Sequence, residues 1–297
     1  MASRSTKLTS RRTKPKVSLF RYMVQKFYHY SVPPVLCNSF PKSGTHLLMG
    51  IVSQVYPFFH FRRRVLWHSL VRTRIHPREM SSVKEVTGSL ANHLPGEIFI
   101  GHLEALPEIC STLERYRFKK FFIYRDLRDV VISLFFMWKN GQGADQWPRR
   151  YFLEKLQSDS ERISFLISGW GGKGGFLKDA PETVDFPNVA ERFIGNLPWL
   201  SDPNCMKIKY EDLLSQETQN HILSKMATYL LDTDHPRTIE KAVDKMKKGF
   251  APSLSKTFRK GQTGEWEKYF DSEHKKLFKE CAGEMLITLG YEKDMDW

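Results

Sequence analysis

The residues best suited to chemistry lie in the segment FPKSGTHLL, at positions 40–48 of this 297-residue chain. Lys42 supplies a positive charge and Gly44 permits a tight turn, while Ser43 and Thr45 add hydroxyl groups on either side of the glycine. A turn of this kind between a strand and a helix exposes backbone N–H groups that bind anions, so the segment predicts a phosphate-binding loop. It is not a Walker A loop, in which the Lys directly follows the last Gly. The alternative is an ordinary turn in which Ser43 or Thr45 caps the helix.

Two further clusters have the composition of a second phosphate site. In the segment FFIYRDLRDVVIS, Arg125 ends an apolar run and Ser133 follows eight residues later in a helical pattern. An Arg side chain at a strand end can donate two parallel hydrogen bonds to a phosphate group, although pairing of Arg125 with Asp129 is the alternative. The third cluster is the basic turn in FRKGQTGEW, which contains Arg259, Lys260 and Gly261.

The elements that position these clusters are four short apolar runs, each of which leads into a polar turn or a helical pattern. They predict buried parallel strands at 35–40, 97–101, 120–124 and 206–210. Helices are expected at 46–56, after Arg125 through Trp138, from 211 to about 230, and from an N-cap at Ser272 to Gly290. Strands that alternate with helices predict an α/β fold with a central parallel sheet flanked by helices. Ligands bind such sheets at the carboxyl ends of the strands, where the first two clusters lie.

Taken together, the three motifs and their order resemble those of cytosolic-type sulfotransferases. The resemblance implies a single domain over residues 17–297 with the sulfotransferase fold, which is related to P-loop kinases. It implies 3′-phosphoadenosine 5′-phosphosulfate (PAPS) as co-substrate and no metal. In that family the first loop holds the 5′-phosphosulfate, so Lys42, Ser43, Gly44 and Thr45 are expected at that end of the nucleotide, and His46 and Leu47 are expected to contact the nucleotide as well. The 3′-phosphate is expected on Arg125, Ser133, Arg259, Lys260 and Gly261.

The resemblance also assigns a general base. His102, in the segment FIGHLEALP, occupies the place of the family's catalytic His, and Lys42 would stabilise the leaving phosphate. The chain departs from the family at Ile100 and Gly101, where relatives carry Lys and Thr. These departures indicate a divergent member.

The adenine site departs from the family as well. His46 and Leu47 replace a Thr and an adenine-stacking Trp. We therefore expect adenine to be held mainly by apolar packing, with Tyr210 at the place of an adenine-contacting Tyr.

The implied reaction is transfer of a sulfuryl group from PAPS to a hydroxyl or amine of a small-molecule acceptor, which the sequence does not identify. The acceptor pocket is expected from residues 58–77 and 141–175. Two other classes stay open. A P-loop phosphotransferase would need a Walker Lys and an Asp for Mg²⁺. A basic module that binds nucleic acid or membrane would explain the charge but not three phosphate motifs, two of them at strand ends.

Charge and composition set the remaining expectations. The net charge is +13, and 15 Lys and Arg residues precede the first acidic residue, Glu79. Residues 1–16 are expected to be a basic disordered tail on a cytoplasmic protein, with import into an organelle as the alternative. No apolar run approaches the roughly 20 residues of a membrane helix. The four cysteines form no CxxC pair, so no metal site is expected. The sequence predicts no nucleic-acid partner and leaves the oligomeric state open.

Overall fold

A parallel sheet forms the centre of the computed structural model, which describes residues 32–55, 64–68, 82–143, 147–170, 186–250 and 262–297. Its five strands run in the order β2-β3-β1-β4-β5, and every neighbouring pair is parallel. The strands are β1 (Val35–Ser39), β2 (Arg64–His68), β3 (Ile98–Leu103), β4 (Lys119–Tyr124) and β5 (Cys205–Lys209). The predicted α/β fold with a central parallel sheet is confirmed, and β2 is a fifth strand that the pattern did not predict.

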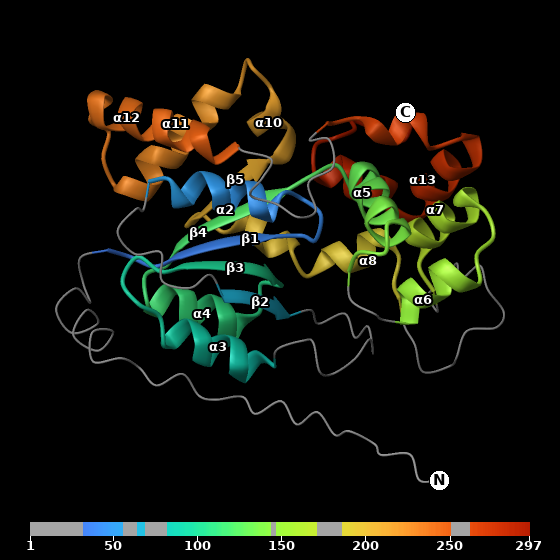
Figure 1. Cartoon of the computed structure of the whole chain (residues 1–297), viewed down its shortest axis with the longest axis horizontal. Coiled ribbons are helices and arrows are strands. Elements are labelled where there is room, and N and C mark those ends of the chain that lie inside the picture. The colour runs from blue at the N-terminus through green and yellow to red at the C-terminus, as the bar shows by residue number, and fades with distance from the viewer. Residues whose placement is uncertain (1–31, 56–63, 69–81, 144–146, 171–185, 251–261) are drawn as a thin grey trace, which may run out of the picture.

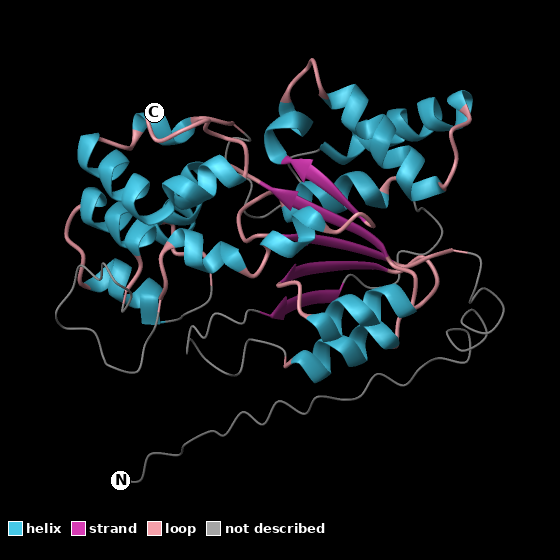
Figure 2. Cartoon of the chain, turned by 180° about the vertical axis from the view of Figure 1, so that it is seen from behind, coloured by secondary structure: helices cyan, strands magenta, loops and turns pink. Residues whose placement is uncertain are grey.

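Helices cover both faces of this sheet and continue beyond the carboxyl ends of its strands (Figures 1 and 2). One face carries α2 (Thr45–Ser53), α10 (Tyr210–Leu214), α11 (Gln219–Leu231) and α12 (Pro236–Lys247). The other face carries α3 (Val83–Ala91) and α4 (Pro107–Arg115). A further group consists of α5 (Leu127–Lys139), α6 (Trp147–Glu154), α7 (Asp159–Ser168) and α13 (Ser272–Thr288). Between that group and β5 run α8 (Val189–Ile194) and α9 (Leu197–Ser201).

The core follows from the two-residue period of the strands. Val35 and Cys37 of β1 pack into the cluster formed with α2, α11 and α12. Leu36, between them, packs into the cluster formed with α3, α4 and α5. All five residues of β1 are buried, so both faces of the central strand are covered by helices.

The strand order reverses at β1. The chain passes from β1 to β2 and β3 on one side of it and then crosses to β4 and β5 on the other. In open parallel sheets the crevice at such a reversal, beyond the carboxyl ends of the strands, is the usual ligand site. The segments that leave β1, β3 and β4 at that edge begin at Phe40, Glu104 and Arg125.

Several predicted boundaries differ from the structure. The helix expected from 211 to about 230 is two helices, α10 and α11, with a break after Leu214. The cap of α13 is Asp271 and not Ser272, because the Asp271 side chain accepts a hydrogen bond from the backbone of His274. Gly290, with a φ of 69°, follows the end of α13 as predicted.

Two further observations concern the helices and the cysteines. Among the described residues, no helix combines the length and the apolar character of a membrane span. All four cysteines are free thiols, and Cys37 and Cys205 are buried. The tail at 1–16 lies outside the described residues, and its disorder stays a prediction.

Candidate active site

The phosphate-binding loop connects β1 to α2, as predicted. Gly44 lies in the left-handed region with a φ of 100°, and Lys42 also has a positive φ of 71°. A Cβ atom on residue 44 would lie 2.6 Å from Cδ2 of Tyr210, so this position requires glycine. The N-terminus of α2 has no side-chain cap, which contradicts the alternative of an ordinary turn capped by Ser43 or Thr45.

One buried hydroxyl in the loop is unsatisfied. The Oγ atom of Ser43 is buried and has no hydrogen-bond partner among the described residues. A buried polar atom without a partner is costly, and native proteins rarely keep one outside a functional site. Together with the uncapped N–H groups of α2, it fits an anion bound at this turn.

Lys42 reaches from the loop toward α5. Its Nζ donates a hydrogen bond to Sδ of Met137 over 3.5 Å. Ser133 lies one helical turn before Met137 on α5 and is partly exposed. The loop from β1 and the helix after β4 therefore meet, which brings two predicted site residues, Lys42 and Ser133, to the same region.

His102 lies on β3 next to the loop. Its Nδ1 is 3.0 Å from the carbonyl oxygen of Ser39 and 3.2 Å from the hydroxyl of Ser39. Because a carbonyl oxygen only accepts, Nδ1 carries the proton, and in the neutral ring the lone pair is on Nε2. Burial, with smaller contributions from the charges of His46 and Lys42, lowers the pKa of His102 to about 4 despite the hydrogen bond to Ser39. The ring is therefore neutral at pH 7 and able to accept a proton.

Arg125 directly follows β4 and is buried. Its Nη2 donates to the Asp129 carboxylate over 3.1 Å and to the Gln262 carbonyl over 2.7 Å. Its guanidinium group lies 4.5 Å above the ring of Tyr210, and its Nε is buried without an acceptor among the described residues. The alternative pairing of Arg125 with Asp129 is present, and it leaves this donor available for a phosphate oxygen.

The C-terminal signature is docked against the same place. The backbone N–H groups of Gly264 and Trp266 donate to the Asp129 carboxylate over 2.9 and 3.1 Å. Arg259, Lys260 and Gly261 lie outside the described residues. The described residues that follow them, from Gln262 onward, contact both Arg125 and Asp129.

A second Arg fixes this arrangement. Arg128 pairs with Asp126, at 2.7 Å, and with Glu292, at 2.6 Å. Its guanidinium group contacts the rings of both Trp266 and Trp297, 4.0 and 4.5 Å from their centroids. Asp126 caps α5 by accepting a hydrogen bond from the backbone N–H of Arg128.

The structure shows the environment of the positions at which this chain departs from the family. Ile100 is buried in the core cluster beside α2, so its side chain serves packing. A Cβ atom on residue 101 would lie 3.0 Å from Oδ1 of Asn38, and Gly101 avoids that contact. On α2, His46 is exposed and Leu47 is partly buried against the core. The family resemblance alone gave no account of why Ile100 and Gly101 are tolerated.

Three residues of the site were not identified from the sequence: Ser39, Asp129 as an anchor, and Met137. A signal existed for the first of them, because Asn38 and Ser39 are polar residues at the end of an otherwise apolar strand. Both are buried, and the Asn38 amide bonds to both backbone groups of Leu103 over 2.8 Å.

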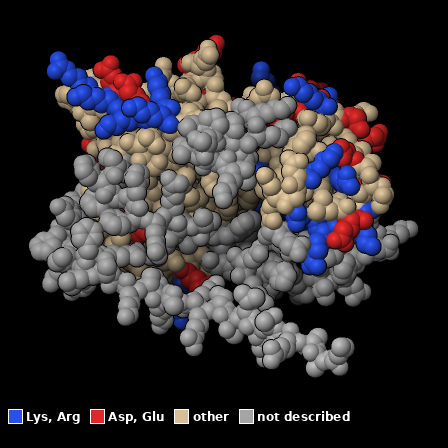
Figure 3. Space-filling view, in the orientation of Figure 1, with Lys and Arg blue, Asp and Glu red and all other residues tan. Residues whose placement is uncertain are grey.

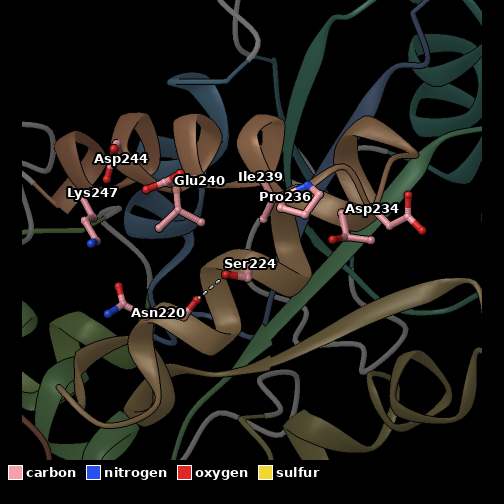
Figure 4. Close-up of a pocket in the computed structure, with 10 residues that line it drawn as sticks. Asn220, Ser224, Asp234, Pro236, Ile239, Glu240, Asp244 and Lys247 are labelled. Atoms are coloured by element: carbon pink, nitrogen blue, oxygen red, sulfur yellow. Dashed lines mark hydrogen bonds between the residues drawn. The ribbon is translucent and has the colours of Figure 1, made fainter.

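A shallow groove of about 530 Å³ lies elsewhere, between α11 and α12. Figure 4 shows it lined by Asn220 and Ser224 from one helix and by Ile239, Glu240, Asp244 and Lys247 from the other. None of the predicted site residues lines it, so the groove is not part of this site. In the described part of the chain no three His, Cys, Asp or Glu side chains gather as metal ligands. That the reaction needs no metal stays a prediction.

Comparison with known proteins agrees with the geometry of the site. A structure of the mouse sulfotransferase SULT7A1 complexed with PAP is similar, with a TM-score of 0.55 and 17% identity over 86% of this chain and 84% of that one. Retinol dehydratase with retinol and PAP gives a TM-score of 0.52 and 16% identity over 89% and 85% of the chains. No curated protein matches the sequence. The sulfotransferase domain model matches residues 33–290, and the chain therefore belongs to the sulfotransferase family.

Proposed function

We propose that the protein transfers the sulfuryl group of PAPS to a hydroxyl or amine of a small-molecule acceptor. The observation that carries the proposal is the convergence on Ser39, where the phosphate loop and the ring of His102 come together. A group that can accept a proton thereby lies beside a site built for an anion.

The residues fit the nucleotide at both of its phosphate ends. The buried, unsatisfied Oγ of Ser43 and the uncapped start of α2 suit the 5′-phosphosulfate, with Lys42, Gly44 and Thr45 around it. The buried Nε of Arg125 suits the 3′-phosphate. We assign Ser133, Arg259, Lys260 and Gly261 to the same end. Tyr210, His46 and Leu47 are assigned to the adenosine.

In the proposed reaction the acceptor oxygen or nitrogen attacks sulfur, and its proton passes to Nε2 of His102. The bond between sulfur and the 5′-phosphate oxygen breaks, and adenosine 3′,5′-bisphosphate (PAP) leaves. Lys42 and the N–H groups of the loop stabilise the negative charge on the leaving phosphate. Since the structure holds the proton of neutral His102 on Nδ1, the ring needs no tautomer change before it acts.

A small-molecule acceptor fits the proposal better than a polyanionic partner does. On the described part of the face in Figure 3, Lys and Arg gather over α12 but alternate with Asp and Glu. A surface that binds nucleic acid or an anionic membrane is usually uniformly basic, and this described part of the face is not. Retinol dehydratase, one structural neighbour, has been solved with retinol and with androsterone, which are small molecules. Cytoplasmic location, and the import alternative, stay predictions.

Sulfur-labelled PAPS offered with a panel of phenols, alcohols, amines and carbohydrates tests the function. We expect labelled product and an equal amount of PAP with at least one acceptor class. His102→Ala should lower turnover by roughly 10²–10⁴ and leave PAP binding nearly unchanged, because a base contacts the acceptor more than the donor. Lys42→Ala should lower both.

A matched panel with Mg-ATP separates this reaction from a kinase reaction. Phosphoryl transfer from ATP with no PAP release from PAPS would overturn the proposal. The protein would be a binding module if it bound PAPS but sulfated no acceptor, and if His102→Ala gave the same two results as wild type.

A further inference from the structure

Ser39 is the last residue of β1, and its side chain is fully buried between the loop and the candidate base. Its Oγ lies 2.5 Å from Oγ1 of Thr45, the first residue of α2. The same Oγ lies 3.2 Å from Nδ1 of His102, and the Ser39 carbonyl lies 3.0 Å from that nitrogen. One residue thus contacts both the phosphate loop and the ring.

The chemistry of the groups fixes one of these hydrogen bonds and permits a direction for the next. The Nδ1–H of His102 donates to the Ser39 carbonyl, so it is also the donor toward the Ser39 hydroxyl. Between Ser39 Oγ and Thr45 Oγ1, 2.5 Å apart, either hydroxyl can be the donor. With Ser39 as the donor, Thr45 keeps its own proton for an acceptor at the loop, and a chain of donors runs from His102 through Ser39 to Thr45.

We propose that Ser39 is a positioning residue that couples proton uptake by His102 to the charge on the phosphate leaving from the loop, through the hydroxyl of Thr45. The inference rests on the proposed function. When Nε2 takes the acceptor's proton, the ring becomes positive and Nδ1–H becomes a stronger donor. Each hydroxyl along the chain is then polarised toward the next, and Thr45 becomes a stronger donor to the loop's anion. The positive charge on the ring and the negative charge on the phosphate develop in the same step, so one chain stabilises both.

The surroundings of His102 explain why such support matters. Burial and the facing charges of Lys42 on the loop and His46 on α2 all disfavour a charged ring. The hydrogen bond from Nδ1 to the backbone carbonyl of Ser39 acts in the opposite direction. The Ser39 hydroxyl is a second acceptor, 3.2 Å from the same nitrogen. Its removal should take further support from the charged ring and make His102 a weaker base, while the Ser39 carbonyl still fixes the tautomer.

The test uses the full chain and a reaction that needs no known acceptor, the hydrolysis of PAPS by water, measured as PAP release. We compare wild type, Ser39→Ala, Ser39→Thr, His102→Ala and the double variant Ser39→Ala/His102→Ala. Ser39→Ala should lose about tenfold or more in rate, because a hydrogen bond to a charged group is lost in the transition state. PAP affinity should change little, and Ser39→Thr should restore most of the rate. In the His102→Ala background, Ser39→Ala should cost nothing further.

A second readout does not depend on turnover. The imidazole of His102, assigned by its loss in His102→Ala, is titrated by NMR with and without PAP. In wild type PAP should raise the pKa of His102, and in Ser39→Ala it should raise that pKa less. If Ser39→Ala does not fold, Ser39→Cys keeps the volume but bonds weakly, and it should show the same two effects.

Multiplicative losses in the double variant, or the same rise in pKa on PAP binding in Ser39→Ala as in wild type, would overturn the coupling. Full activity of His102→Ala would instead overturn the proposed function, because the base would then lie elsewhere. The two failures are distinguishable because the second appears without any change at Ser39.

Discussion

The carboxylate of Asp129 lies 3.1 Å from Nη2 of Arg125 and accepts hydrogen bonds from the backbone N–H groups of Gly264 and Trp266. It is almost completely buried. One side chain on the first turn of α5 therefore joins the strand-end Arg to a segment about 135 residues later in the chain. Parts of the site that are distant in sequence depend on this one carboxylate.

Asp129→Ala should strongly destabilise the protein and weaken PAP binding. It leaves a buried Arg and two backbone N–H groups without their acceptor, and loss of one partner of a buried ion pair costs about 3–5 kcal/mol. Asp129→Asn is the matched control, since its amide oxygen can still accept a hydrogen bond but carries no charge, and it should lose less stability. Denaturant unfolding and calorimetry with PAP measure the two effects. Equal losses for both variants would contradict this expectation and would show that a neutral acceptor at position 129 contributes nothing without the charge.

Arg125 should discriminate between nucleotides. PAP carries the 3′-phosphate that we assign to this side chain, whereas AMP does not. Arg125→Ala should weaken PAP binding by about 10- to 100-fold, in line with the loss of hydrogen bonds between charged groups, and leave AMP binding almost unchanged. Calorimetry with both nucleotides on wild type and variant is the measurement. A wild type that binds AMP as tightly as PAP would contradict the assignment.

The order of helices, the loop and the strand-end Arg could be predicted because each is a local pattern. Strand β2 could not, since only three apolar residues, Val65 to Trp67, follow a run of three Arg. The break between α10 and α11 was missed for a similar reason. It is held by side-chain bonds from Thr218 and Gln219 back to carbonyls of α10, and no Gly or Pro marks it.

Most contacts within the site could not be predicted, because they join residues that are far apart in the sequence. Pairing of Arg125 with Asp129 spans four residues and was foreseen as an alternative. The bonds of Ser39 to His102 span 63 residues, and those of Asp129 to Gly264 span 135. A sequence pattern carries no information on which side chains meet across such separations, because the sheet order decides it.

The pH dependence of stability should report on His102. Its pKa in the folded protein is lowered to about 4, below the ordinary value of 6.5, mainly by burial. The unfolded chain therefore binds a proton between these two values where the folded protein does not. The stability associated with His102 is complete above pH 6.5 and is lost as the pH falls toward 4. His102→Gln, a neutral residue that does not titrate, should flatten this part of the curve of unfolding free energy against pH. An unchanged slope would assign the dependence to other groups.

Two glycines give a matched test of the loop. Gly44 has a φ of 100°, and a Cβ atom added there would lie 2.6 Å from the Tyr210 ring. Gly88 lies inside α3, and a Cβ atom added there would have no neighbour within 4 Å. Gly88→Ala should stabilise the protein by up to about 1 kcal/mol, because alanine favours the helix. Gly44→Ala should destabilise it by at least about 1 kcal/mol from backbone strain alone. Since Tyr210 must also move away from the loop and from Arg125, PAP binding should fall in Gly44→Ala and stay unchanged in Gly88→Ala. Thermal unfolding and calorimetry on both variants decide it, and a Gly44→Ala protein that binds PAP normally would show that the loop tolerates a side chain at this turn.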